Sequence, residues 1–317
     1  MKKVLITGVT GFVGQYLSEN LLSQKNLEIY GTYFSDEGLS RLENARLLHL
    51  KKVDLTVKKE VFDLLDAVKP DQIYHLAAQT SPSDSLKDPE KTLLTNTLSQ
   101  LYLLESLREL GSKTRLLVTS SADVYGIVEK EDLPVDEQTQ FRPINPYAVS
   151  KITQDFLALQ YFLSYNIDVV RVRPFNHVGP RQASKFVVPM FAKQIAEIEK
   201  LGKEPIVKVG NLSAKKDFSD VRDIVRAYIL LMEKGESGDV YNVGSGKSTQ
   251  IQEILNILLS LSEREIKIEE DQDLFRPIDI PELVCDNSKL SNLTGWKPEI
   301  SLETTLKDTL DYFRKVV

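Results

Sequence analysis

Cross-linking and metal-binding side chains are scarce in this 317-residue sequence. It contains one cysteine, Cys285, and three histidines, His49, His75 and His177. A single cysteine excludes a disulfide within the chain, and histidines this far apart give no sign of a metal site. We therefore expect no bound metal and a reducing compartment.

Long apolar runs and an excess of positive charge are absent as well. The apolar segment 4–6 is too short for a signal peptide, and no later run reaches the roughly 18 residues of a membrane-spanning helix. The formal net charge of −6 argues against nucleic acid or an anionic membrane surface as the main partner. We expect a cytoplasmic protein that binds neither nucleic acid nor membrane.

The first half alternates short β-branched segments with longer helical patterns. The predicted strands cover residues 4–7, 27–32, 45–54, 72–78, 115–121 and 168–174. The predicted helices cover residues 12–22, 57–68, 90–110 and 147–165. This alternation predicts an α/β fold with a doubly wound parallel sheet of the Rossmann type.

Glycines follow the first predicted strand in TGVTGFVG, residues 7–14. Gly8, Gly11 and Gly14 stand between that strand and the first predicted helix. There, glycines allow a tight turn and bring backbone N–H groups close to a pyrophosphate. The spacing is GxxGxxG rather than the GxGxxG of many dehydrogenases, and a plain tight turn is the alternative interpretation. We expect a dinucleotide-binding site.

The loosening of the pattern after residue 175 predicts a second domain. We expect residues 1–175 to form the dinucleotide-binding domain, with segments near 215–246 returning to it. Residues 176–317 would mainly form a smaller C-terminal α/β domain for the substrate. A second glycine stretch, YNVGSGKST at 241–249, fails the P-loop template, and we expect a strand-to-helix turn at 244–248.

The end of the second predicted strand bears on the choice of dinucleotide. NAD-selective sites place a carboxylate there, whereas this strand runs into TYFS, beginning at Thr32, before the first acid, Asp36. A 2′-phosphate is then not repelled, and Arg41 or Arg46 could reach it. We favour NADP(H) as the cofactor, with NAD(H) as the alternative.

A tyrosine and a lysine share one face of the fourth predicted helix. In NPYAVSK, residues 145–151, Tyr147 and Lys151 are four positions apart, behind Asn145 as an N-cap and Pro146 in the first turn. Composition alone predicts about one such pair in this chain, so the spacing by itself does not establish a catalytic pair.

Further motifs in the sequence support a catalytic role for Tyr147 and Lys151. The glycine loop, HLAA at 75–78, Asn96, VTSSADVYG at 118–126, YAVSK at 147–151 and RPFN at 173–176 together resemble the extended short-chain dehydrogenase/reductase family. The resemblance implies an NAD(P)-dependent oxidoreductase with Ser121, Tyr147 and Lys151 as catalytic residues. It also implies cofactor contacts from Gly8, Gly11, Phe12, Val13, Gly14, Thr32, Asp54, Leu55, Leu76, Ala77, Ala78, Asn96, Tyr147 and Lys151.

The chemistry of this triad explains the residue types. A phenol is too weak an acid to act as a base at neutral pH, but a nearby ammonium and a positive nicotinamide favour the phenolate. We therefore expect the pKa of Tyr147 to be lowered. Ser121 would hydrogen-bond the reacting oxygen, and Lys151 would also hold the nicotinamide ribose.

Other segments narrow the substrate by resemblance. NHVGPRQ at 176–182, KKDFSDVRD at 215–223 and the stretch 276–301 resemble GDP-mannose 4,6-dehydratases and the related GDP-6-deoxy-4-ketohexose reductases. The resemblance implies a GDP-sugar substrate held by Ser121, Asn176, Phe186, Val187, Asn211, Lys216 and Arg276. Lys216 replaces an arginine of many relatives, and a solvated lysine pair is the alternative interpretation.

One position separates reduction from dehydration. Relatives that eliminate water carry an acid, normally glutamate, two places after the triad serine or threonine, whereas this chain has Ala122 and then Asp123. We expect Asp123 to be at most an auxiliary group, and the enzyme to reduce C4 of a GDP-6-deoxy-4-ketohexose, giving GDP-D-rhamnose. The alternatives are a dehydratase, a nucleotide-sugar epimerase and, from another class, a non-catalytic dinucleotide-sensing protein.

The helix at 147–165 has more apolar side chains than one buried stripe needs, among them Phe156, Leu159 and Leu163. We expect its second face to pair with another copy of the chain in a homodimer.

Overall fold

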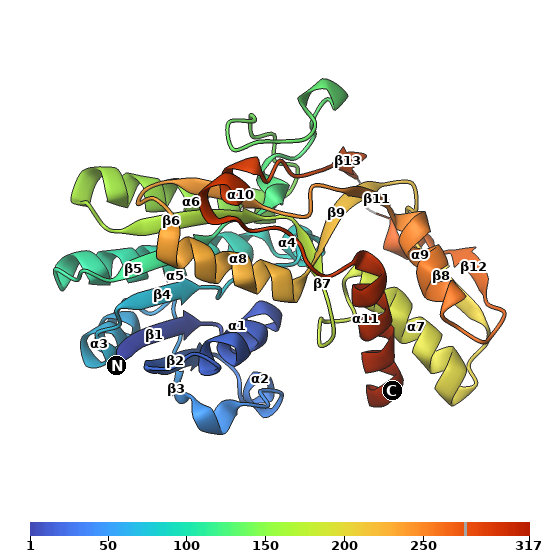
Figure 1. The fold of residues 1–317 in the computed structure, drawn as a ribbon, viewed down its shortest axis with the longest axis horizontal. Coiled ribbons are helices and arrows are strands. Elements are labelled where there is room, and N and C mark those ends of the chain that lie inside the picture. The colour runs from blue at the N-terminus through green and yellow to red at the C-terminus, as the bar shows by residue number, and fades with distance from the viewer. Residues whose placement is uncertain (276–277) are drawn as a thin grey trace.

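A seven-stranded parallel sheet forms the centre of the computed structural model, which describes residues 1–275 and 278–317 (Figure 1). The strand order is β10-β6-β5-β4-β1-β2-β3. The strands are β1 (Lys2–Thr7), β2 (Leu27–Tyr33), β3 (His49–Lys52), β4 (Gln72–His75), β5 (Arg115–Thr119), β6 (Val169–Pro174) and β10 (Val240–Val243). The doubly wound α/β fold expected from the sequence is confirmed.

Helices cover both faces of the sheet. Val4 and Ile6 of β1 pack into one core and Leu5 into the other, as alternation requires of a strand buried on both sides. One face is covered by α1 (Phe12–Leu22), α8 (Val221–Lys234) and α10 (Ser288–Thr294). The other is covered by α3 (Lys58–Val68), α5 (Pro89–Glu109) and α6 (Pro146–Tyr165). Within the described residues no helix combines the length and apolar character of a bilayer-crossing segment.

The strand order reverses between β1 and β4. The chain runs from β1 to β2 and β3 on one side, then crosses to β4, β5 and β6 on the other. In open parallel sheets such a reversal leaves a crevice at the carboxyl ends of the strands, and ligands bind there.

The C-terminal region forms two smaller sheets around a separate core. Their strands are β7 (Asn176–Val178), β8 (Ile206–Val209), β9 (Lys215–Asp220), β11 (Ser248–Gln250), β12 (Lys267–Glu270) and β13 (Glu282–Leu283). The helices here are α7 (Val187–Leu201), α9 (Ile251–Ser260) and α11 (Leu302–Val316). In Figure 1 this region lies beside the carboxyl edge of the large sheet, with α11 against α7.

The segment 215–246 divides between the two regions. The strand β10 pairs with β6 at the edge of the large sheet, and α8 packs on that sheet, whereas β9 belongs to the four-stranded sheet with β7, β11 and β13. The division of the chain into two domains at residue 175 stays a prediction.

Several predicted strands are shorter in the structure. The predicted strand 45–54 is a 3-10 helix at Ala45–Leu47 followed by β3, because β3 pairs with only four residues of β2. The predicted strands 72–78 and 115–121 end at His75 and Thr119, where pairing with their neighbours stops. The residues that follow each strand therefore lie in loops at the crevice.

The glycine stretch at 244–247 connects two strands, β10 and β11, so the predicted strand-to-helix turn is wrong in its second element. Its backbone binds an anion that the chain itself supplies. The Asp217 carboxylate accepts hydrogen bonds from the N–H groups of Ser245 (2.8 Å), Gly246 (2.8 Å) and Cys285 (3.1 Å). Because these N–H groups already donate to Asp217, the turn has a structural role in the fold.

A buried carboxylate joins α6 to β6. Asp155, fully buried, lies 2.5 Å from a guanidinium nitrogen of Arg171 and 2.8 Å from one of Arg173. Both arginines are also buried. The group holds the helix that carries Tyr147 and Lys151 against the sheet.

We predict that Asp155→Ala lowers the free energy of unfolding by about 3–5 kcal/mol, because it leaves two buried guanidinium groups without their carboxylate. Urea unfolding measures the change. The control is Asp63→Ala on α3, which removes an exposed ion pair with Lys59 and should change stability by less than about 1 kcal/mol. Equal effects of the two substitutions would contradict the prediction.

Candidate active site

A cavity of about 1070 Å³ opens at the carboxyl edge of the large sheet, between that sheet and the C-terminal region. The predicted site residues that line it are Gly8, Gly11, Phe12, Val13, Gly14, Thr32, Asp54, Leu55, Leu76, Ala77, Ala78, Ser121, Asp123, Tyr147, Lys151, Asn176, Phe186, Val187 and Lys216. Positions spread over more than 200 residues of sequence therefore share one space. Among the described residues, no group of His, Cys, Asp or Glu side chains is arranged to hold a metal ion.

The glycine loop forms a tight turn from β1 into α1. Gly8 has a φ of +72°, and a Cβ there would lie 2.9 Å from the Cα of Ala77. A Cβ on Gly14 would lie 2.5 Å from the carbonyl oxygen of Gly8. Gly11 is the N-cap residue of α1, and it has no side chain that could accept hydrogen bonds from the first turn. The backbone N–H groups of that turn therefore face the cavity without a side-chain cap. This loop fits the pyrophosphate of a dinucleotide.

At the end of β2, Thr32 is buried and its hydroxyl accepts a hydrogen bond from the N–H of Gly8 (3.2 Å). The arginines expected near a 2′-phosphate, Arg41 and Arg46, do not line the cavity. The guanidinium of Arg41 instead contacts the carboxylate of Glu37. Reaching a phosphate would require Arg41 to leave that exposed partner.

Asn96 lies behind the residues that line the cavity and makes hydrogen bonds with them and with α6. Its amide accepts a hydrogen bond from the N–H of Gln79 (2.8 Å) and donates to the carbonyl of Gln79 (3.0 Å) and the hydroxyl of Ser150 (2.8 Å). Asn96 therefore fixes the loop after β4 relative to α6, and it is not among the residues that line the cavity.

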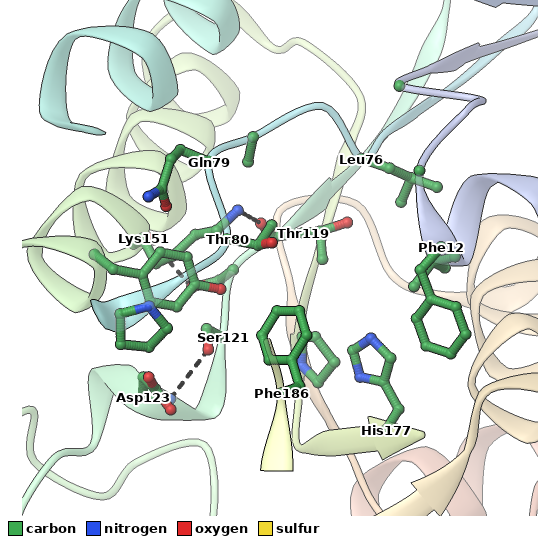
Figure 2. A pocket seen from close by; sticks show the side chains of 18 of the residues that line it. Phe12, Leu76, Gln79, Thr80, Thr119, Ser121, Asp123, Lys151, His177 and Phe186 are labelled. Atoms are coloured by element: carbon green, nitrogen blue, oxygen red, sulfur yellow. Dashed lines mark hydrogen bonds between the residues drawn. The ribbon is translucent and has the colours of Figure 1, made fainter. Parts of the chain in front are cut away.

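The triad residues meet where α6 begins beside the end of β5. Asn145 caps α6 by accepting a hydrogen bond from the N–H of Ala148 (2.8 Å), so Tyr147 lies in the first turn. Ser121 begins the short 3-10 helix Ala122–Val124 and accepts a hydrogen bond from the N–H of Asp123 (3.2 Å). Figure 2 shows Lys151, Ser121 and Asp123 along one side of the cavity, facing Phe186, His177 and Phe12.

Burial shifts the pKa values of the two α6 residues in opposite directions. Burial raises the pKa of Tyr147, and the charge of Asp123 raises it further, while a hydrogen bond with Ser121 lowers it. Burial lowers the pKa of Lys151 to about 7. The Lys151 ammonium lies 6.0 Å from the centre of the Tyr147 ring and donates to the carbonyl of Thr119 (2.8 Å). Burial and the Asp123 charge set the direction of the Tyr147 pKa in the chain alone, and the lowering expected beside a positive nicotinamide stays a prediction.

The wall of the cavity opposite the large sheet comes from the C-terminal region. Phe186 is the N-cap residue of α7, and Lys216 of β9 donates to the carbonyl of Ile280 (2.9 Å). Asn211, expected at the substrate, is not among the lining residues, and its amide donates to the carboxylate of Asp279 (3.0 Å). Arg276, expected at the diphosphate, lies outside the described residues.

Two contacts hold the cavity walls together across long sequence separations. The Lys185 ammonium lies 2.8 Å from a carboxylate oxygen of Asp84 in α4 (Pro82–Lys87). The Tyr16 hydroxyl of α1 donates to the carbonyl of Pro180 (3.0 Å). The loop after β7 is therefore tied to the sheet region on both sides of the cavity.

Sequence reasoning missed several polar lining residues. Gln79 and Thr80 directly follow HLAA, and Gln182 ends the NHVGPRQ stretch, so position next to a motif could have identified them. Thr119 and Tyr228 also line the cavity, but the sequence marks them only as a strand residue and a buried helix residue. Their place at the site follows from tertiary structure.

Comparisons with known proteins identify one family model and several similar sequences and structures. The family model described as GDP-mannose 4,6 dehydratase matches residues 5–309. GDP-6-deoxy-D-mannose reductase from Pseudomonas aeruginosa is 34% identical, over 98% of this chain and 96% of its own length. GDP-mannose 4,6-dehydratase from Yersinia enterocolitica is 30% identical, over 96% of this chain and 91% of its own length. The solved structure of RMD from Pseudomonas aeruginosa complexed with NADPH has a TM-score of 0.88 at 33% identity and covers 100% of both chains.

The lowered pKa of Lys151 predicts a pH-dependent stability. Between the folded pKa of about 7 and the ordinary value of 10.5, the unfolded chain holds a proton that the folded chain releases, so stability rises with pH in this window. From pH 7 to pH 9, the unfolding free energy of the unsubstituted protein should gain about 2 kcal/mol relative to that of Lys151→Met. Urea unfolding at both pH values measures this.

The control is Lys59→Met, an exposed lysine of α3, whose substitution should leave the pH dependence unchanged. Parallel pH profiles for Lys151→Met and the unsubstituted protein would mean that Lys151 keeps its ordinary pKa.

Proposed function

The chain belongs to the GDP-mannose 4,6-dehydratase family, and on that premise we propose that it is a reductase acting on a GDP-6-deoxy-4-ketohexose. Hydride from NAD(P)H would reach C4 of the sugar and give a GDP-6-deoxyhexose, with GDP-D-rhamnose as the favoured product. The observation that carries the proposal is the buried Tyr147 beside Ser121 at the cavity, where Ala122 and Asp123 stand in place of the acid, normally glutamate, of the relatives that eliminate water.

The chain's own residues supply the proton and the positioning. A bound NAD(P)H supplies the hydride. The Tyr147 hydroxyl donates its proton to the sugar oxygen at C4, and the Ser121 hydroxyl hydrogen-bonds the same oxygen. Lys151, fixed to the carbonyl of Thr119, stands four residues along the same helix face, where it can hold the ribose next to the reacting ring. The ketone gains one hydride and one proton and becomes an alcohol.

The raised pKa of Tyr147 suits reduction. A reductase needs its phenol protonated at the start of the reaction, and burial keeps Tyr147 in that form at neutral pH. An oxidising step would need the phenolate instead, against the effect of burial and of the Asp123 charge. Asp123 lines the cavity, but its side chain is one methylene shorter than the glutamate of the eliminating relatives.

For the cofactor we propose NADPH, with NADH as the alternative. Thr32 stands at the end of β2 in place of the carboxylate that holds the ribose hydroxyls in NAD-selective sites. The RMD structure with NADPH, which this chain resembles over its whole length, supports the same choice.

We expect the protein to oxidise NADPH when mixed with GDP-4-keto-6-deoxymannose, measured as loss of cofactor absorbance. Tyr147→Phe should lower kcat by about 10²–10⁴-fold because it removes the proton donor. The matched control is Tyr165→Phe, which removes an exposed hydroxyl at the far end of the same helix and should leave kcat unchanged.

Two other outcomes would replace the proposal. A keto product formed from GDP-mannose without net use of cofactor would identify a dehydratase. Tight NADPH binding without turnover of either sugar would identify a dinucleotide-sensing protein.

We also propose that the protein is a homodimer paired through α6. Val149, Phe156 and Leu163 stand seven residues apart on one face of this helix and are exposed by 42%, 52% and 71%, a large apolar area for one helix face. Sedimentation should show a dimer that Leu163→Glu shifts to monomer, while Leu201→Glu at the exposed end of α7 leaves it intact. A monomer for the unsubstituted protein at all concentrations would remove this proposal.

A further inference from the structure

A buried histidine lies next to the residues that line the cavity and joins the sheet to α6. His75 is the last residue of β4, it is 2% exposed, and it is not itself among the lining residues. Its Nδ1 atom lies 2.8 Å from the hydroxyl oxygen of Thr7 at the end of β1. Its Nε2 atom lies 3.4 Å from the side-chain nitrogen of Gln154 on α6. The proposed reaction gives none of these three buried side chains a role.

The imidazole of His75 carries no charge at neutral pH. Burial, with a smaller effect from the charge of Lys151, lowers its pKa to about 3. Among the described residues, no carboxylate forms a hydrogen bond or an ion pair with the ring. A neutral imidazole has its hydrogen on one nitrogen and accepts at the other, and the neighbours of the two nitrogens decide which form is present.

The hydroxyl of Thr7 decides between the two forms. Its oxygen accepts a hydrogen bond from the N–H of Ala77 (3.3 Å), so its own hydrogen needs an acceptor. Thr7 is fully buried, and within the described part of the chain the other partner of this hydroxyl is Nδ1 of His75. Nδ1 is then the acceptor, which places the ring hydrogen on Nε2.

The hydrogen on Nε2 faces the side-chain amide of Gln154. This amide is buried, and its oxygen has no partner among the described residues. The two ends of an amide have nearly the same shape, so a half-turn brings the oxygen to Nε2. The oxygen then accepts the hydrogen bond from His75, and both ring nitrogens and the Thr7 hydroxyl have partners.

Gln154 shares the buried face of α6 with two of the triad residues. Tyr147, Lys151 and Gln154 follow one another at spacings of four and three residues, which places them on one side of the helix. Gln154 is less than one turn beyond Lys151. A contact that holds Gln154 therefore also bears on where Tyr147 and Lys151 stand.

The chain of hydrogen bonds begins beside the glycine loop. Ala77 lines the cavity, and a Cβ on Gly8 would lie 2.9 Å from the Cα of Ala77. From Ala77 the chain passes through Thr7 and His75 to Gln154. It therefore connects the backbone that packs against the glycine loop with the helix that carries the triad tyrosine and lysine.

We propose that His75, with its ring hydrogen on Nε2, is a positioning residue of this reductase. It accepts a hydrogen bond from the Thr7 hydroxyl and donates one to the amide oxygen of Gln154, and so holds α6 where Tyr147 and Lys151 meet the cofactor. The state of the ring follows from the hydrogen bonds alone. Its effect on the reaction rests on the proposed function, and a different measurement tests each part.

Nitrogen-15 NMR of protein labelled in its histidines tests the state of the ring, whether or not the protein is active. The signal of His75 is the one that disappears in His75→Asn. We expect the hydrogen on Nε2 and no change of this signal between about pH 6 and pH 8. A hydrogen on Nδ1, or a ring that gains a proton in this range, would overturn the inference.

Gln154→Met tests the effect on the reaction, because it removes the acceptor and keeps a side chain of similar length. We expect kcat for NADPH oxidation with GDP-4-keto-6-deoxymannose to fall by about three- to tenfold, the range for one lost hydrogen bond that positions reacting groups. KM for the sugar should change by less than about twofold, since Gln154 does not line the cavity. The rate is expressed per NADPH-binding site, counted by isothermal titration, so unfolded chains do not lower it.

His75→Asn keeps an acceptor for Thr7 but is too short to reach Gln154, so it should lower kcat by a similar factor. Because both substitutions break the same contact, the double variant should be no slower than the slower single variant. The control is Ser106→Ala, which removes a buried hydroxyl of α5 that has no partner among the described residues and should leave kcat unchanged.

Two kinetic results would overturn the positioning role. An unchanged kcat per binding site in Gln154→Met, even with a lower melting temperature, would leave the contact with a role in stability only. Effects that multiply in the double variant would mean that the two substitutions act through different contacts. If the unsubstituted protein binds NADPH but reduces no GDP-keto-sugar, the proposed function fails and the positioning role with it, whereas the NMR result still decides the state of the ring.

Discussion

Lys151 makes one hydrogen bond with the last residue of strand β5 and another with the residue that follows it, and the arrangement of the candidate site depends on these two contacts. The Lys151 ammonium donates to the carbonyl of Thr119, and the hydroxyl of Ser120 donates to the carbonyl of Lys151 (3.1 Å). These contacts fix the first turns of α6 beside the end of β5, where Ser121 follows. The buried Asp155 group then holds the middle of the same helix to β6. The positions of Tyr147 and its neighbours are therefore set by the sheet.

Burial away from water is the main cause of the pKa shifts of both Tyr147 and Lys151 on α6. Burial makes the charged form of each side chain unfavourable, so Tyr147 stays protonated and the pKa of Lys151 falls to about 7. A protonated Tyr147 can give a proton away, which is what the proposed hydride delivery to a ketone requires.

The two glycine-containing loops show how similar local sequences acquire different roles. Both present backbone N–H groups in tight turns. At residues 244–247 the carboxylate of Asp217 in β9 accepts hydrogen bonds from the N–H groups of Ser245 and Gly246, and it also accepts one from Cys285. These hydrogen bonds hold the turn after β10 against β9 and the segment at Cys285. The loop at residues 7–14 lines the cavity instead, and it passes so close to Ala77 that Gly8 has no room for a side chain.

The sequence by itself determined the alternating α/β architecture, the glycine loop, the cap at Asn145 and the Tyr147 and Lys151 pair, because all are encoded in local periodicity and short motifs. It did not determine where β4 and β5 end, since strand length follows from pairing with neighbours. It also could not show that Asn96 stands behind the wall or that Tyr228 and Thr119 reach the cavity. Tertiary structure decided these points, and with them the direction of the Tyr147 pKa shift, because burial depends on residues that are distant in the chain.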